Sequence, residues 1–288
     1  MNAAFDTASS IRSSTRSSAR SSTRFSARFS THFGPSFRAA RSAVRSFALV
    51  APLLTCLAFA QMLLPTSAAA ATVQGSGTPT SENRNLAEFQ AVTLNGSIDL
   101  VVRQGAQSVQ VQADDNLLPL LETIVEPGGS GPALVVRWKK GHSVRTRSKV
   151  LVTVSSPRLS ALASSGSGDI RLETFNTPAL KFAMSGSGDV HIDKLSTEDL
   201  DIGIAGSSDV VGSGRARRLK VSIAGSGDVR LGELQAEEVN IRIAGSGDAA
   251  VHADKALAVS IMGSGDVRYS GNPSLKTSVA GSGSIHRR

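Results

Sequence analysis

The chain has 288 residues and a formal charge of +8, but residues 1–71 hold eight arginines and one acid, which leaves 23 basic and 22 acidic side chains for the rest. A near-neutral body excludes a general nucleic-acid binder, because affinity for a polyanion needs a standing positive field. The single cysteine, Cys56, excludes a disulfide framework and a cysteine zinc cluster.

Residues 1–71 have the features of an export signal. The first 46 residues alternate Ser, Arg, Ala, Thr and Phe, a basic low-complexity tract that cannot bury a core. An apolar run from Phe47 to Leu64 follows, and then the small-residue stretch Ser67–Ala71. This order is typical of a secretory signal with a long basic n-region and cleavage near Ala71. We therefore expect an exported bacterial protein, periplasmic, in the cell envelope or secreted, whose signal segment enters the membrane only during export.

Two alternatives stay open for this segment. About 18 apolar residues are enough to span a bilayer, so an uncleaved membrane anchor is the first alternative. Lipidation at Cys56 is the second, but the apolar run continues past the cysteine.

The next two segments have no repeat. Residues 72–85 are rich in Gly, Ser, Thr and Pro, and we expect a flexible lead-in. Within residues 86–160, Phe89–Val102 alternates apolar and polar residues, and Ala133–Val154 predicts a hairpin that turns near Gly141. Residues 116–121 between them indicate a short turn or helical piece. We expect residues 86–160 to form the starting coils or an N-terminal β cap of the stack that follows.

Residues 161–288 repeat a hexapeptide of the type Ser-Gly-Ser-Gly-Asp-Val seven times, at intervals of 18–20 residues. Apolar residues lie nine, seven and five positions before its acidic residue and one and three positions after it. All these offsets are odd, so each repeat is extended chain with one buried face. The acidic position holds Asp169, Asp189, Asp209, Asp228, Asp248 and Asp266, and Ser284 in the last copy.

A unit of this length cannot bury its face alone, but it can be one coil of a stack. We therefore predict an all-β fold: a right-handed parallel β-helix or solenoid with coils of about 18–20 residues and an N-terminal β cap. Parity places the two glycines of each repeat inward at a corner, where a side chain would collide with the opposite wall. The same parity places the Ser and the Asp outward, so that stacking aligns a serine row and an Asp row.

The ladder of Gly-Ser-Gly-Asp-Val coils, together with the segment Leu94–Gly105 (Leu-Asn-Gly-Ser-Ile-Asp-Leu-Val-Val-Arg-Gln-Gly), resembles the putative auto-transporter adhesin head domain, or GIN domain, family. The resemblance covers about residues 86–285. It implies a β-solenoid fold in a secreted or envelope protein, and an adhesive role that the family name itself suggests.

The Asp row admits two interpretations. Carboxylates about 5 Å apart repel one another, and a bound calcium ion would relieve this repulsion. The alternative, which we favour, is that each Asp accepts hydrogen bonds from backbone N–H groups at its own turn. We therefore expect no cofactor, with structural calcium at the Asp row as the alternative.

A second candidate site is a basic segment with no acid between Glu126 and Asp169. It is suited to anionic polysaccharide or lipid headgroups, and its alternative role is to discourage edge pairing of strands. Its cations are Arg137, Lys139, Lys140, Arg145, Arg147 and Lys149.

The sequence offers no catalytic constellation. The histidines of the body fall at unrelated offsets, and no serine stands in a nucleophile-elbow context. We therefore expect a non-enzymatic envelope or surface interaction module, whose partner is an envelope glycan or a surface protein and not a nucleic acid. The alternatives are a structural envelope protein and a carbohydrate-active β-helix enzyme.

Overall fold

The computed structural model describes residues 71–129 and 131–288, and these residues are almost entirely β-strand. The secretory signal expected before Ala71, with Cys56, lies outside the described residues. The strands and the one 3-10 helix are β1 (Ala71–Gln74), β2 (Pro79–Arg84), β3 (Ala91–Asn95), β4 (Asp99–Gln104), β5 (Ser108–Asp114), η1 (Leu118–Leu120), β6 (Leu121–Gly128), β7 (Gly131–Trp138), β8 (His142–Arg145), β9 (Leu151–Ser156), β10 (Ala161–Gly166), β11 (Ile170–Leu172), β12 (Phe175–Gly186), β13 (Val190–Gly206), β14 (Val210–Gly225), β15 (Val229–Gly245), β16 (Ala249–Gly263), β17 (Val267–Ser270), β18 (Ser274–Gly281) and β19 (Ile285–Arg287).

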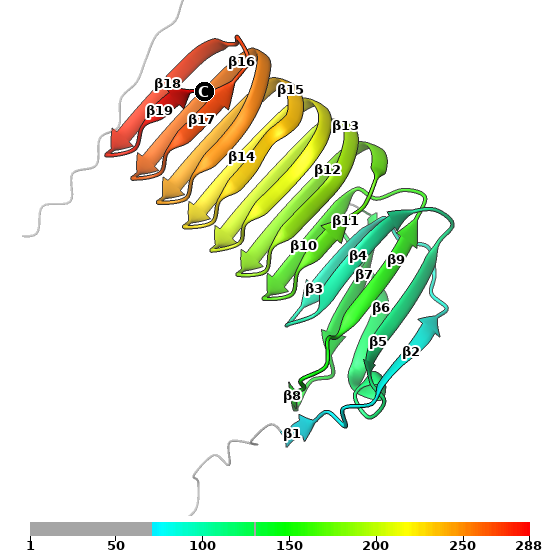
Figure 1. The fold of residues 1–288 in the computed structure, drawn as a ribbon. Helices are drawn as coiled ribbons and strands as arrows, with labels where there is room; N and C mark the ends of the chain where they lie inside the picture. The colour runs from blue at the N-terminus through cyan, green and yellow to red at the C-terminus, as the bar shows by residue number, and fades with distance from the viewer. Residues whose placement is uncertain (1–70, 130) are drawn as a thin grey trace, which may run out of the picture. The chain divides into compact units, whose positions relative to one another are not determined.

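Successive coils stack in parallel, which confirms the predicted β-solenoid (Figure 1). Each coil has two walls and two corners, as β14 illustrates. Residues 218–225 lie in the first wall and residues 210–211 in the second, and a register shift within the strand marks one corner between them. The other corner is the Gly-Ser-Gly-Asp turn, which we call the glycine corner.

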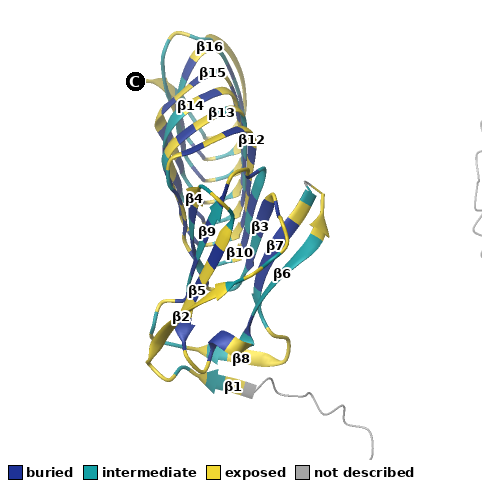
Figure 2. Ribbon diagram, turned by 90° about the vertical axis from the view of Figure 1, so that its right-hand side faces the viewer, coloured by how far each residue is buried: buried dark blue, intermediate teal, exposed yellow. Residues whose placement is uncertain are grey.

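The core runs between the two walls as one continuous apolar cluster from Phe89 to Val267. Ile223 pairs with Ile243, which pairs with Ile261, and all three are at most 2% exposed. Buried and more exposed positions alternate along strands β12 to β16 (Figure 2). The period of two read from the repeat therefore defines which side chains build the interior.

The first coils of the stack do not follow sequence order. The coil made of β3 and β4 lies between the coil of β7 and β9 and the coil of β10 and β11. At the N-terminal end of the stack, β6 pairs antiparallel with β7, β5 pairs antiparallel with β9, and β2 covers β5. Pro79 in β2 and Pro127 in β6 lie on these outer strands, where a missing N–H discourages further pairing.

The prediction that residues 72–85 form a flexible lead-in is wrong. Residues 71–74 pair in parallel with β8, and residues 79–84 pair antiparallel with β5. The side chains of β2 are nearly all exposed, so no hydrophobic pattern marks it as a strand. β2 is held in place by backbone hydrogen bonds to β5, which is distant in the sequence.

The prediction that Ala133–Val154 forms a hairpin is also wrong. β7 pairs with β3 and β6, whereas β9 pairs with β4 and β5. These two strands are the opposite walls of one coil, so their apolar residues meet across the core instead of side by side. The real hairpin joins β6 and β7 and turns between Gly128 and Gly131. The short helical piece expected over residues 116–121 is confirmed as η1.

No helix within the described part of the chain has the length and apolar character needed to cross a membrane.

Because Ile243 points inward and Ser246 points outward, substitutions at these two residues should change the free energy of unfolding by very different amounts. Ile243→Asp places a charge without a partner in a thin core, so we expect the free energy of unfolding to fall by more than about 3 kcal/mol. Ser246→Ala, at an exposed position, is expected to change it by less than about 1 kcal/mol. Urea unfolding of both variants measures this, and equal losses would show that the parity assignment is wrong.

Candidate functional site

The glycine corner is built on two rows of small residues. The glycines three positions before each Asp align in register from coil to coil. Gly225 has a φ of +139°, and a Cβ placed on it would overlap the carbonyl oxygen of Gly206 in the preceding coil. The collision that excludes a side chain is therefore with the backbone of the adjacent coil and not, as the sequence suggested, with the opposite wall.

Ser208 takes the place of the second glycine in one coil. It is 1% exposed, and its hydroxyl has no hydrogen-bond partner. In the next coil, a Cβ on Gly227 would overlap the carbonyl oxygen of Ser208. The corner thus accommodates one hydroxymethyl group in this row, while the neighbouring coil still requires glycine.

Carboxylates at the acidic position form a hydrogen-bonded ladder along this corner. The backbone N–H of each Asp donates to Oδ1 of the Asp one coil before it, at 2.8–3.1 Å. The ladder consists of Asp99, Asp169, Asp189, Asp209, Asp228, Asp248 and Asp266. Ser284 ends it, because both its N–H and its hydroxyl donate to Asp266, at 2.9 and 2.6 Å.

Two details differ from the sequence interpretation. The N–H that each carboxylate accepts belongs to the following coil and not to its own turn, so the ladder joins coils instead of closing turns. The ladder also includes Asp99, which the repeat count missed. Its segment Gly96-Ser97-Ile98-Asp99 keeps the Gly-Ser-x-Asp order, but the next copy follows 70 residues later, because strands β5 to β10 intervene in the sequence.

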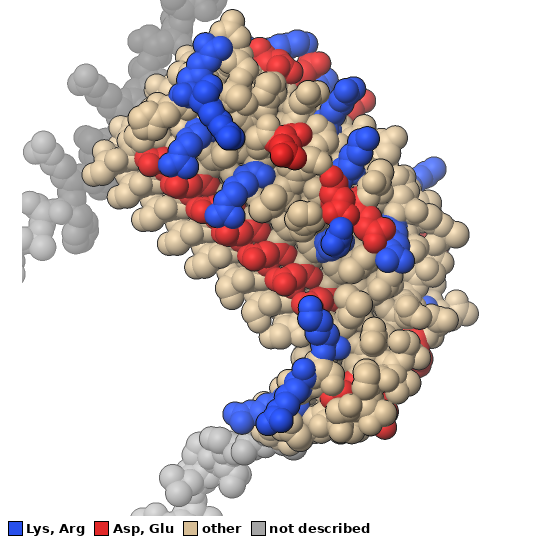
Figure 3. Space-filling model, viewed as in Figure 1, with Lys and Arg blue, Asp and Glu red and all other residues tan. Residues whose placement is uncertain are grey.

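The ladder brings like charges together along an edge that solvent reaches, where two carboxylates are exposed and five are half-buried (Figure 3). Water screens the repulsion between carboxylates about 4.8 Å apart, and the Arg230 guanidinium lies 3.3 Å from Asp209 and 2.9 Å from Asp228. The hydroxyl and N–H of Ser284 lower the pKa of Asp266. The stabilisation from this pair is therefore present above the unfolded-state pKa of about 3.9 and is lost as the pH falls through the lower folded-state pKa.

Within the described residues, no group of three or more His, Cys, Asp or Glu side chains is arranged to hold a metal ion. In the ladder, one oxygen of each carboxylate is already the acceptor for a backbone N–H, which leaves the other for solvent or a cation. The calcium alternative therefore remains a prediction to be tested in solution.

If the carboxylates act as hydrogen-bond acceptors, a chelator should leave the stability of the protein unchanged, whereas removing one carboxylate should lower it. We expect a chelator to leave the thermal unfolding temperature unchanged. Asp189→Ala should lower the free energy of unfolding by about 1 kcal/mol, because it leaves the N–H of Asp209 without its acceptor, and Asp189→Asn should cost less because it keeps an oxygen there. A drop of several degrees with chelator, reversed by added calcium, would instead make the Asp row a metal site.

The basic segment lies at the glycine corner of the coil built by β7 and β9. The neighbouring coil joins β3 to β4 through residues 96–98 alone, whereas here residues 139–150 separate β7 from β9. We call residues 139–149 the basic loop. Its cations Lys139, Lys140, Arg145, Arg147 and Lys149 are all exposed.

Arg137 is separate from these five cations. It lies in β7, its side chain is 31% exposed, and it forms ion pairs with Glu122 at 3.0 Å and Glu126 at 3.4 Å. The charge of Arg137 is thus neutralised by its own hairpin. In the described part of the chain no carboxylate lies within ion-pair distance of the five cations of the basic loop. Five of the six predicted residues remain candidates for binding an anion.

The basic loop is anchored at several points. Val144 pairs with Val73 of β1, and both pack against the core. The hydroxyl of Thr146 donates to Oδ2 of Asp114 at 2.7 Å. Asp114 is 1% exposed, and hydrogen bonds from the hydroxyls of Ser148 and Thr146 lower its pKa. The loop therefore has a defined shape at neutral pH.

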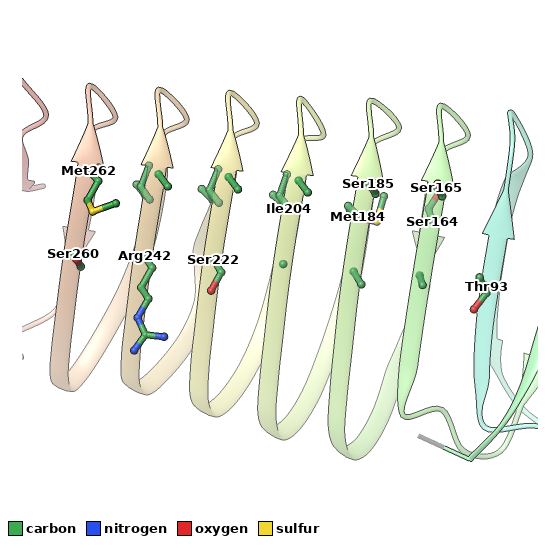
Figure 4. Close-up of a pocket in the computed structure, with 18 residues that line it drawn as sticks. Thr93, Ser164, Ser165, Met184, Ser185, Ile204, Ser222, Arg242, Ser260 and Met262 are labelled. Carbon is green, nitrogen blue, oxygen red and sulfur yellow. The ribbon is translucent and has the colours of Figure 1, made fainter. Parts of the chain in front are cut away.

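A shallow groove of about 720 Å³ crosses the outer face of the first wall (Figure 4). Its lining comes from β3, β10 and strands β12 to β16 and consists mainly of Ala and Ser, with Met262 64% exposed at one end. Arg242 is the one ionisable side chain in this lining, and it lies between Ser222 and Ser260 in the register. The groove is a second surface on which an apolar ligand could lie.

The structure also contains a Ser-His-Asp contact that the sequence analysis missed. Nδ1 of His252 lies 2.9 Å from Oγ of Ser270, and its Nε2 lies 2.9 Å from Asp254. His252 and Ser270 are register partners on β16 and β17, so the contact links adjacent coils. The trio lies outside five surface hollows of 530–880 Å³ formed by the described residues, and we interpret it as an interstrand hydrogen-bond network.

Comparison with known proteins agrees with this architecture. Residues 88–273 match the family described as putative auto-transporter adhesin, head GIN domain. The crystal structure of a putative adhesin from Bacteroides fragilis is 25% identical with a TM-score of 0.71, over 75% of this chain and 100% of that one. The structure of a putative lipid binding protein from Parabacteroides distasonis is 27% identical with a TM-score of 0.63, over 75% of this chain and 99% of that one. No curated protein matches the chain.

Proposed function

Because the chain belongs to the putative auto-transporter adhesin, head GIN domain family, we propose that it is a non-enzymatic, exported adhesin-like module that binds a partner at the bacterial cell envelope or surface. The observation that supports this proposal is the basic loop. It expands a corner that the adjacent coil closes with three residues, and it displays five exposed cations. Binding residues concentrate on loops that a rigid scaffold positions.

Two other functions make different predictions. A structural envelope protein would need its stacked coils but not the charges of the basic loop. An enzyme would need a reactive group, and the Ser270–His252–Asp254 contact is the arrangement in the described residues that most resembles one. We assign it a structural role, because a nucleophile needs a cavity in which a substrate can be held beside it.

The proposal is tested by export and by binding. In a bacterial host, we expect the full chain to be exported, to begin near Thr72 by N-terminal sequencing, and to be accessible to protease on intact cells. A variant without residues 1–71 is the control and should stay in the cytoplasm. The exported protein, purified and immobilised on beads, should then retain material from envelope fractions.

Cytoplasmic retention of the full chain, or an exported protein that retains no envelope material, would contradict the proposed function. Covalent labelling by a fluorophosphonate probe that is lost in Ser270→Ala would contradict the non-enzymatic part of it.

A further inference from the structure

The basic loop combines dense positive charge with a fixed backbone. Eleven residues carry five cations and no acid, whereas several arginines of the second wall have carboxylate partners. Arg171, for example, lies 3.0 Å from Asp193. A cation without a partner gains the full charge-assisted contact with an incoming anion, because no internal ion pair has to be broken first.

The loop is held from both sides. On one side β8 has β1 as its strand partner, and the N–H of Gly75 donates to the carbonyl of Arg145 at 2.8 Å. On the other side the N–H of Lys139 donates to the carbonyl of Leu120 at 2.9 Å. A loop held in one conformation loses less entropy on binding than a mobile one.

The strand that supports the loop is itself tied down by polar contacts. Asn116 donates through its amide nitrogen to the carbonyl of Gln74 at 2.8 Å and accepts the N–H of Ser76 at 3.0 Å. The hydroxyl of Ser76 donates to Asp115. Together with Asp114, which accepts from Thr146, these residues lock residues 71–76 and the basic loop to the end of β5.

We propose that the basic loop is a binding site for an anionic glycan, a polymer that carries carboxylate or sulfate groups, and that residues 71–76 and Asp114 are positioning elements for it. This inference rests on the proposed function and names its ligand class. Several charges along one polymer engage the loop at once, so the affinity is electrostatic and depends on salt.

Three observations favour a glycan over other polyanions. The one apolar side chain of the loop, Val144, is packed against the core, so the loop has no apolar group to insert into a bilayer. The carboxylate ladder reaches Asp99 in the adjacent coil, so the positive charge is confined to the loop, which suits one polysaccharide chain better than a nucleic-acid duplex that requires a broad positive field. Trp138, immediately before the loop, is likewise half-buried and packed against the core, so it adds no exposed apolar group that could enter a bilayer.

The charge test uses two variants with the same loss of three positive charges. One is Lys140→Gln with Arg145→Gln and Arg147→Gln. The matched control is Lys181→Gln with Lys194→Gln and Arg215→Gln, which are exposed cations elsewhere on the stack with no ion pair among the described residues. Both are checked by circular dichroism and thermal unfolding before binding is measured.

The probes are polygalacturonate and dextran sulfate, with neutral dextran, phosphatidylglycerol vesicles and duplex DNA for comparison. We expect the exported protein to bind both anionic polysaccharides more tightly than the other probes. The loop variant should lose at least tenfold in affinity and have a weaker salt dependence, whereas the control variant should stay within twofold. Equal losses in the two variants, or tighter binding to vesicles or DNA, would overturn the assignment.

The positioning role is tested without changing any charge. Thr146→Val removes the donor to Asp114, and we expect a threefold to tenfold loss of affinity, an unchanged salt dependence and faster amide exchange in β8. Thr146→Ser should restore all three. Wild-type affinity in Thr146→Val would refute the positioning role. An exported protein that binds envelope material but none of the polysaccharides would refute the ligand class and leave the proposed function standing.

Discussion

The close approach of successive backbones at the glycine corner is the constraint on which the rest of this structure depends. Parallel coils stack about 4.8 Å apart, and at this corner the carbonyl of one coil occupies the space that a Cβ of the next would need. The first glycine of each turn also has a positive φ, between +134° and +154° in the seven repeats, which other residues adopt only with strain. Glycine is therefore required for both conformation and space.

The carboxylate ladder is a consequence of this spacing. Because the corners superimpose, the side chain of each Asp reaches the N–H of the next Asp, and the bond recurs at nearly constant length through the stack. The same superposition places like charges in a line, and their exposure to water keeps this repulsion small. The glycine corner has little freedom to vary in sequence. A surface of different chemistry is therefore found where one coil lacks this tight turn, in the basic loop between β7 and β9.

The sequence predicted the repeated part of the fold well because local pattern and global structure agree there. The odd offsets of apolar residues determine the inward rows, and Ile243 and Ser246 lie where the period of two places them. The first coils were less predictable. The partners of β7 and β9 come from residues 91–104 and from strands that run antiparallel, and one chain's hydrophobic pattern does not encode which distant strand lies beside it.

Of the candidate sites, the sequence identified the Asp row and the basic segment by residue type and missed how each is organised. The donor to each carboxylate lies in the following coil, about 20 residues away in the sequence. The neutralisation of Arg137 depends on the β6–β7 hairpin, which was not expected. The support of the basic loop by β1 comes from a segment whose composition resembles a linker, because backbone pairing leaves no signature in its side chains.

The most direct test of this account compares two neighbouring methyl groups at the glycine corner. Gly225→Ala places a Cβ against the carbonyl of Gly206 at a positive φ, whereas Ser226→Ala retains an existing Cβ at an exposed position. In urea unfolding, the account predicts that Gly225→Ala lowers the free energy of unfolding by about 2 kcal/mol or more, and that Ser226→Ala changes it by less than about 0.5 kcal/mol. Equal stability of the two variants would contradict the claim that backbone contact at this corner governs the stacking.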